Sequence, residues 1–133
     1  MTNDLEYVRA RIPGYRDYED EAARHDSDIR VRAYVGEALA AARDRLGALS
    51  PETTESFERT LLHCMFNDLS FVQAIEHATL DQTMIAALVA GDRALVELAD
   101  RAGQVSAAGF PALLELIEAQ FVARHSPASR YSR

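Results

Sequence analysis

The side chains best suited to chemistry form a possible column of metal ligands near the N-terminus. On a continuous helix, the spacing i, i+4, i+8 and i+11 places four of them on one face: Asp17, Glu21, His25 and Asp28. Carboxylates and imidazole are common ligands of divalent cations. Helical di-metal proteins, however, use inward-facing Glu-x-x-His motifs, and the sequence contains none. The column is a weak candidate, since a solvated charged face explains the same spacing, and we expect no bound metal or other cofactor.

The single cysteine is the strongest nucleophile of the chain, and its neighbours argue against a reactive role. Cys64 shares a predicted helical face with Phe57 and Leu61, which indicates a buried, inert thiol. His63 points about 100° away, toward a polar face, so the two do not form a nucleophile–base pair. The chain has no GxSxG motif and its glycines are isolated, so it lacks a serine nucleophile elbow and a glycine-rich phosphate loop. We assign no catalytic residue and favour a protein that is not an enzyme.

The composition of the chain limits its partners. All 14 basic residues are arginine, which is typical of GC-rich bacterial genomes and excludes lysine-dependent catalysis. A net charge of −7 disfavours DNA and anionic membrane surfaces. The segment 71–102 has the layout of a helix-turn-helix, but its second helix carries no arginine before Arg93. With one cysteine and no apolar run close to the roughly 20 residues of a membrane span, we expect a cytoplasmic protein without nucleic-acid or membrane contacts.

Proline, glycine and capping residues divide the chain into helices. Pro13-Gly14 is the pairing of a type II turn, and Ser50-Pro51 is the pairing of an N-cap with a first helical residue. Apolar residues between such signals recur with the helical period, and no run alternates as a strand does. We predict an all-α helical bundle of four to five helices: a long first helix over 15–48, a second beginning at Pro51, and others over 71–77, 80–102 and from 106–111 up to Ser126-Pro127. The expected organisation is an N-terminal segment with its turn (1–14), the bundle domain (15–125) and a flexible tail (126–133).

The long first helix carries two apolar stripes that face different directions. One comprises Tyr15, Tyr18, Ala22 and Ile29; the other comprises Val31, Val35, Leu39, Ala42, Leu46 and Leu49. Their centres lie about 120° apart. An unbroken helix over 15–48 would be about 50 Å long, against about 36 Å for the diameter of a compact domain of this size. Two outcomes stay open: the helix breaks at the poor helix formers 25–28 and its first half folds back, or that half projects and packs on another protein.

The stretch RIPGYRDY, from Arg11 to Tyr18, leads into an Arg/Glu/Asp-rich helix that extends to Leu46. It resembles the opening of a set of uncharacterised bacterial helical proteins that share an IPGY-x-x-Y start and a charged helix. The resemblance covers about the first third of the chain. It implies a helical fold and no particular activity or catalytic residue.

The sequence favours a non-enzymatic helical protein–protein interaction or self-association module, of the adaptor or scaffold type. The expected partner is another protein or a second copy in a homodimer. The expected contact is the N-terminal charged helix, through Tyr15, Tyr18, Ala22 and Ile29. Two alternatives are a small metal-binding protein or enzyme that uses the column of carboxylates and histidine, and an acidic regulatory protein acting in transcription.

Overall fold

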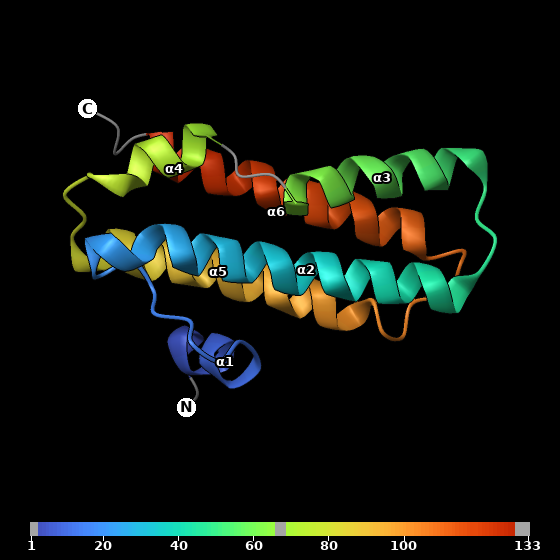
Figure 1. Cartoon of the computed structure of the whole chain (residues 1–133), viewed down its shortest axis with the longest axis horizontal. Helices are drawn as coiled ribbons and strands as arrows, with labels where there is room; N and C mark the ends of the chain where they lie inside the picture. Colours follow the sequence, from blue (N-terminus) through green and yellow to red (C-terminus); the bar gives the residue numbers. More distant parts are fainter. Residues whose placement is uncertain (1–2, 66–68, 130–133) are drawn as a thin grey trace.

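Helices make up most of the part of the chain that the computed structural model describes, residues 3–65 and 69–129 (Figure 1). This part contains six α-helices: α1 (Asp4–Arg11), α2 (Arg24–Leu46), α3 (Pro51–Met65), α4 (Leu69–Glu76), α5 (Gln82–Arg101) and α6 (Phe110–Ser129). A 3-10 turn, η1 (Glu21–Ala23), leads into α2. No strand occurs in these residues, so the predicted all-α bundle is confirmed.

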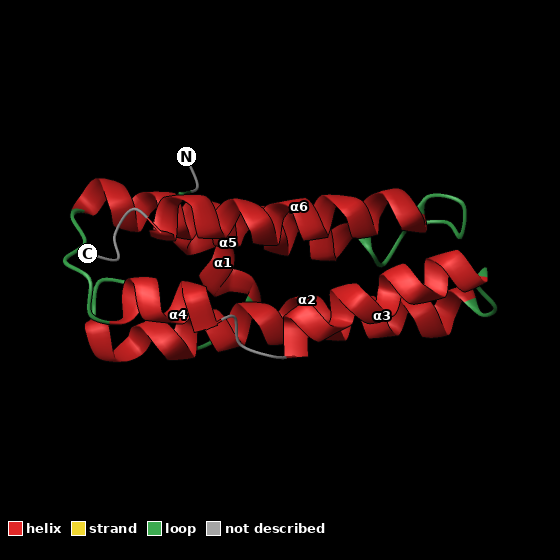
Figure 2. Cartoon of the chain, turned by 90° about the horizontal axis from the view of Figure 1, so that it is seen from above, coloured by secondary structure: helices red, strands yellow, loops and turns green. Residues whose placement is uncertain are grey.

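The helices form two layers (Figure 2). In one layer α2 lies beside α3 and α4, which follow one another as a single column; in the other layer α5 lies beside α6. α2 also packs on α5, and α6 packs on α3 and α4, so the four columns enclose one core. α1 lies outside the four columns and packs on α5 (Figure 1). The architecture is a four-helix bundle with a divided second column.

Side chains just before the long helices determine where these helices begin. Ser50 Oγ accepts a hydrogen bond from the N–H of Thr53 at 3.1 Å, and Pro51 is the first helical residue, as predicted. Asp81 caps α5, because its Oδ1 accepts a hydrogen bond from the N–H of Met84 at 2.9 Å. Both caps satisfy backbone N–H groups that have no partner inside their helix.

The core consists of the inner stripes of the long helices. The second predicted stripe of the first long helix is confirmed, because Val31, Val35 and Leu39 are fully buried. The other large apolar side chains with almost no exposure are Phe71, Ile75, Leu95, Phe110, Leu114 and Ile117. Burying a side chain of this size contributes about 1.5–3 kcal/mol. The packing of these stripes therefore supplies most of the free energy that holds the bundle together.

The long first helix begins later than the sequence predicts. Residues 12–20 follow an irregular path, and α2 starts only at Arg24. Asp20 produces this break, since its Oδ1 accepts a hydrogen bond from the N–H of Ala22 at 3.0 Å and caps η1. The chain thus breaks just before the predicted 25–28, and its first part folds back on the bundle. The alternative of a projecting arm is wrong.

The last helix extends further than predicted. Its backbone continues through Ser126-Pro127 to Ser129, so the expected stop is wrong. A proline this close to a helix end removes one of the helix's own hydrogen bonds and does not prevent the last turn from forming. Residues 130–133 of the expected tail lie outside the described residues.

Candidate functional site

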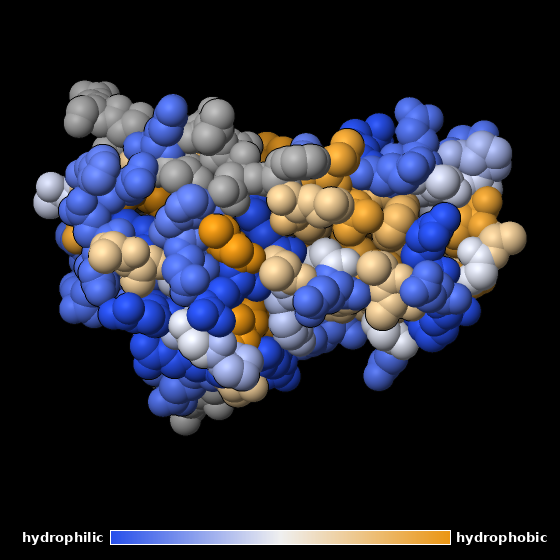
Figure 3. Space-filling model, in the orientation of Figure 1, coloured by the Kyte–Doolittle hydropathy of each residue, from blue (hydrophilic) through white to orange (hydrophobic). Residues whose placement is uncertain are grey.

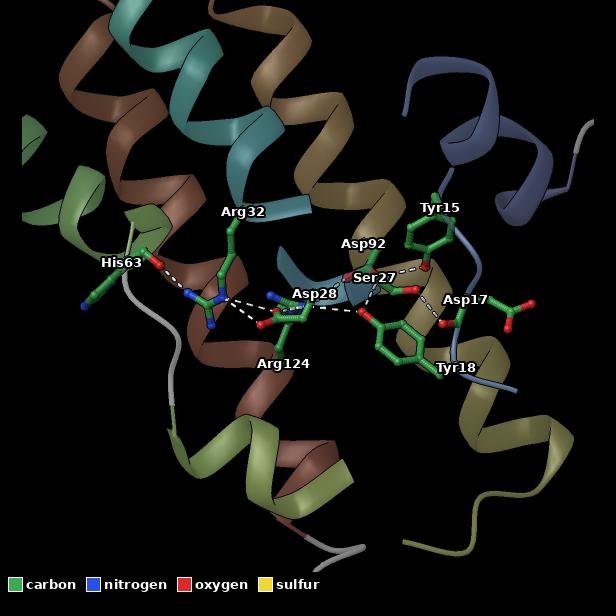
Figure 4. Close-up of polar contacts among 9 residues, drawn as sticks. All are labelled: Tyr15, Asp17, Tyr18, Ser27, Asp28, Arg32, His63, Asp92 and Arg124. Carbon is green, nitrogen blue, oxygen red and sulfur yellow. Dashed lines mark hydrogen bonds and ion pairs between the residues drawn. The ribbon is translucent and has the colours of Figure 1, made fainter. Parts of the chain in front are cut away.

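Buried polar side chains gather where the irregular segment 12–20 crosses the bundle (Figure 4). We call this segment the strap. We call the six side chains that meet beneath it the polar cluster: Tyr15, Tyr18, Asp28, Arg32, Asp92 and Arg124. None of these residues is more than 5% exposed. They come from the strap, α2, α5 and α6, and tertiary packing brings them together.

Two carboxylates and two guanidinium groups form a chain of ion pairs in the polar cluster. Arg32 Nε lies 3.0 Å from Asp28 Oδ2. Arg124 Nη2 lies 2.8 Å from Asp28 Oδ1 and 3.2 Å from Asp92 Oδ1. The effective cost of burying an unpaired ion is several kcal/mol, so buried charges need such partners. The two positive and two negative charges balance one another inside the bundle.

The two tyrosines of the strap complete the polar cluster. The hydroxyls of Tyr15 and Tyr18 donate to Asp92 Oδ2 at 2.7 and 2.6 Å, and Arg124 Nη2 donates to the Tyr18 hydroxyl at 3.2 Å. Burial, and then the charge of Asp92, raises the pKa of both tyrosines, so they stay protonated donors at neutral pH. Burial also raises the pKa of Asp92, while Arg124 and the two hydroxyls oppose that rise.

A tight turn brings the chain into the strap, as the sequence predicts. Gly14 has φ +91°, and the N–H of Tyr15 donates to the carbonyl of Ile12 at 3.1 Å, which are marks of a type II turn. Arg30 Nη1 donates to the carbonyl of Pro13 at 3.0 Å. Glycine is needed here for its conformation, and a Cβ, which would lie 2.8 Å from that same nitrogen, would also displace the Arg30 side chain.

The first turn of α2 holds the backbone of the strap. Ser27 Oγ donates to the carbonyl of Asp17 at 2.7 Å, and Arg24 Nε donates to the carbonyl of Tyr18 at 3.0 Å. Asp17 itself has φ +56°, a left-handed conformation that Asp tolerates better than most residues. Its Oδ1 accepts a hydrogen bond from the N–H of Glu19 at 2.7 Å, which stabilises this conformation. The polar cluster and these bonds together join the strap to three helices.

The four predicted metal ligands do not share one helical face, so the prediction of a ligand column is wrong. Asp17 lies in the strap instead of on a helix, and Asp28 points into the polar cluster (Figure 4). Glu21 Oε1 lies 2.7 Å from His77 Nδ1, and His25 is exposed on α2. No three acidic, histidine or cysteine side chains of the described residues lie close enough to share a metal ion. The spacing argument failed because it required an unbroken helix from residue 17 to residue 28.

The four residues predicted to contact a partner divide into two pairs. Tyr15 and Tyr18 are 2% and 0% exposed within their own subunit, so their prediction as surface contacts is wrong. They face inward because the strap folds back and their hydroxyls reach Asp92. Ala22 and Ile29 are exposed. Only the second pair stays accessible to another molecule.

His63 and Cys64 point in different directions, as predicted. Cys64 is buried, and burial raises the pKa of its thiol to about 12, so the predicted buried thiol is confirmed. His63 Nδ1 lies 2.8 Å from Glu118 Oε2, and its ring meets that of Phe121 edge-on with centroids 6.3 Å apart. The carbonyl of His63 accepts a hydrogen bond from Arg32 Nη1, which ties α3 to the polar cluster.

An exposed apolar face spans α2 and α3. Its large side chains are Ile29 on α2 and Leu62 and Met65 on α3, which are 43, 51 and 65% exposed. Ala33 and Ala40, also exposed, extend it along α2. Figure 3 shows hydrophobic residues gathered over these two helices, with hydrophilic residues around them. We call these five residues the α2–α3 face.

Sequence reasoning missed three members of the polar cluster, Arg32, Asp92 and Arg124. Asp92 lies on the buried stripe of α5, four residues after Leu88 and three before Leu95. Arg124 lies three residues after the buried Phe121 on α6. The signal was a charged residue at the period of an apolar stripe, which predicts a buried charge in need of a partner.

Comparison with protein families, curated proteins and solved structures finds no match to this chain. None of the described helices combines the length and the apolar character that crossing a membrane requires.

Proposed function

We propose that the protein is a non-enzymatic self-association module in which the α2–α3 face contacts the same face of a second copy. The observation that supports this most is the exposure of Ile29, Leu62 and Met65. Each large apolar side chain that a contact removes from water contributes about 1.5–3 kcal/mol. Single exposed apolar residues are common on monomers, whereas a group of neighbouring ones is typical of a protein-binding surface.

The members of the α2–α3 face are neighbours in space. Leu62 and Met65 are one turn apart on α3. The bond from Arg32 to the carbonyl of His63 places α2 beside this turn. Ile29 lies one turn before Arg32 on α2. The exposed apolar side chains therefore lie along two helices that are next to each other.

A second copy is the partner that α2 fits best, because its exposed stripe is complementary to itself. A two-fold interface brings the same patch of both copies together. When two α2 helices pack antiparallel about an axis between residues 34 and 35, Ile29 of one copy lies opposite Ala40 of the other. A large side chain then meets a small one at each end, which allows the helices to approach closely.

The charges that flank this stripe also suit an antiparallel pair. In the same arrangement Arg30 lies within two residues, about 3 Å along the helix, of Glu37 in the other copy. Opposite charges across an interface favour one orientation over another. As in the contact predicted from the sequence, the N-terminal charged helix and Ile29 take part. Leu62 and Met65 of α3 take the place of the two buried tyrosines.

Light scattering after size-exclusion chromatography tests the proposal. We expect the wild-type protein to show the mass of two chains at about 100 μM. At this concentration a dimer is detectable if its association free energy is about −5.5 kcal/mol or more favourable. Met65→Glu and Ile29→Glu each place a charge in the contact, and we expect the mass of one chain with unchanged helical circular dichroism. A wild-type monomer at this concentration rejects the proposal.

Leu116→Glu is the matched control. Leu116 is 48% exposed, close to the values of the α2–α3 face, but it belongs to α6 in the other layer. We expect this variant to keep the mass of two chains. A dimer that survives Met65→Glu and is lost in Leu116→Glu would assign the contact to the α5–α6 layer instead.

A further inference from the structure

We infer that residues 3–20, which comprise α1 and the strap, open as one unit from a bundle that stays folded, and that this opening uncovers the buried charges of the polar cluster. Such opening is independent of self-association through the α2–α3 face. Two features favour it: the distribution of the buried charges, and the way in which the segment is attached.

The four charges of the polar cluster are balanced without the strap. All four charged members of the polar cluster belong to α2, α5 and α6, and their ion pairs join these three helices. The strap contributes the neutral hydroxyls of Tyr15 and Tyr18. When it leaves, these ion pairs persist, and water can replace the two hydroxyls at Asp92. The polar cluster therefore keeps its charge balance in the open state.

The segment has an exposed connection at one end and weak polar attachments at the other. Residues 19–22 are all exposed, so their backbone angles can change without unpacking the core. α1 packs on α5, with two partly exposed ion pairs along its edge: Arg93–Asp4 at 3.0 Å and Arg11–Asp100 at 2.8 Å. Ion pairs at such positions contribute little to stability. The segment can therefore swing away about residues 19–22.

The bonds that Ser27 and Arg24 donate to strap carbonyls help to hold the segment closed, and so do four of its buried side chains: Val8, Ile12, Tyr15 and Tyr18. Tyr18 has the most extensive polar contacts of the four, because its hydroxyl donates to Asp92 and accepts from Arg124. Both partners belong to the bundle. Tyr18 is therefore the residue at which a single-atom change shifts the opening equilibrium most.

Native-state hydrogen exchange on the full chain measures this opening. The reporters are the amides of Ile12 and Tyr15, which are bonded to the carbonyls of Val8 and Ile12. Both bonds lie within the opening segment, and we expect them to break in the open state because a helix as short as α1 is not stable in water without its packing on α5. In the wild-type protein we expect them to exchange faster than the core amides of α6 and with a weaker dependence on denaturant, since less surface is exposed. Tyr18→Phe removes a hydroxyl bonded to two charged groups, and we expect it to speed exchange at both reporters about tenfold to a hundredfold.

Phe57→Leu, toward the other end of the bundle, is the control. Phe57 packs against Phe110, with ring centroids 6.2 Å apart. Its substitution destabilises the closed and open forms equally, relative to the unfolded chain. We therefore expect the amides of α6 to exchange faster while those of Ile12 and Tyr15 keep their wild-type rates. If Phe57→Leu speeds strap and α6 amides by the same factor, the chain is one cooperative unit and the inference is overturned. Unchanged exchange of Ile12 in Tyr18→Phe also overturns it, and Phe110→Leu replaces the control if Phe57→Leu does not fold.

Discussion

Arg124 is the positive charge that both buried carboxylates share, and its replacement is the most direct test of the polar cluster. It lies 2.8 Å from Asp28 and 3.2 Å from Asp92. Burial acts to lower the pKa of Arg124, but Asp92 and the other groups around it outweigh burial and raise this pKa. Arg124→Met keeps an apolar stem of similar length and removes the charge. Asp28 and Asp92 then have one guanidinium between them, that of Arg32, so one buried negative charge is unbalanced.

We expect Arg124→Met to lower the free energy of unfolding by about 3–5 kcal/mol at neutral pH, the usual cost of removing one partner of a buried ion pair. This is a large part of the free energy of unfolding of a typical domain, which is about 5–15 kcal/mol. The loss should shrink in acid. Removing Arg124 raises the pKa of Asp92 further. A carboxyl group whose pKa is raised in the folded state contributes stability below its ordinary pKa of 3.8, and this stability is lost as the pH rises through the pKa of the folded state. The variant therefore recovers stability as the pH falls from neutral toward 3.8.

Urea unfolding followed by far-ultraviolet circular dichroism measures these differences, because the chain has no tryptophan. Arg16→Met is the control: its pair with Asp20 is short, at 2.9 Å, but exposed, and we expect a change below about 1 kcal/mol. The double variant Arg124→Met/Asp92→Asn restores the charge balance and should recover part of the loss. A cost below about 1 kcal/mol for Arg124→Met, or a double variant less stable than Arg124→Met, would refute the charge-balance account.

Three further outcomes check other parts of the structure. The contact of Glu21 with His77 raises the pKa of His77 above 6.5. The stability that this contact contributes is therefore present below pH 6.5 and is lost as the pH rises through the pKa of the folded state. Titration followed by nuclear magnetic resonance should show a lower pKa for His77 in Glu21→Gln. Because burial raises the pKa of Cys64 to about 12, a thiol-specific disulfide reagent at mildly alkaline pH should react far more slowly with folded than with urea-unfolded protein, and equal rates would contradict its burial. Gly36→Ala places a Cβ 3.2 Å from the Cβ of Cys64 and should cost about 1–3 kcal/mol, whereas Gly91→Ala, with no contact closer than 3.7 Å, should stabilise by up to about 1 kcal/mol. Thermal unfolding compares the two glycine variants, and the reverse order would contradict close packing of α2 on α3.

Local signals in the sequence predicted the helices where those signals were strong. The Ser50-Pro51 pair marks the start of α3, and the predicted helix 80–102 matches α5 (Gln82–Arg101) closely. Both succeed because capping and helical period act over a few residues, within reach of a sequence pattern. The same reasoning failed at Ser126-Pro127, where the helix continues to Ser129.

The strap could not be predicted in this way. Tyr15, Tyr18, Ala22 and Ile29 recur at helical spacing, yet the first two belong to an irregular segment. Their spacing suits the helix period, while their positions depend on Asp92, which lies more than 70 residues further along the chain. A period measured within one segment contains no information about such a distant partner. The length argument did show that an unbroken first helix was too long for the bundle, and the fold-back was one of its two outcomes.

The amino-acid order alone determined the all-α class, the Pro13-Gly14 turn, the Ser50-Pro51 start of α3 and the burial of Cys64, because each depends on neighbours within a few residues or on one helical face. Tertiary packing decided the rest. It turned Tyr15 and Tyr18 inward, separated the column of metal ligands and left the α2–α3 face exposed. The physical reason is that these positions depend on partners far away in the sequence: the hydroxyls of Tyr15 and Tyr18 reach Asp92 of α5 only when the strap folds back over the bundle.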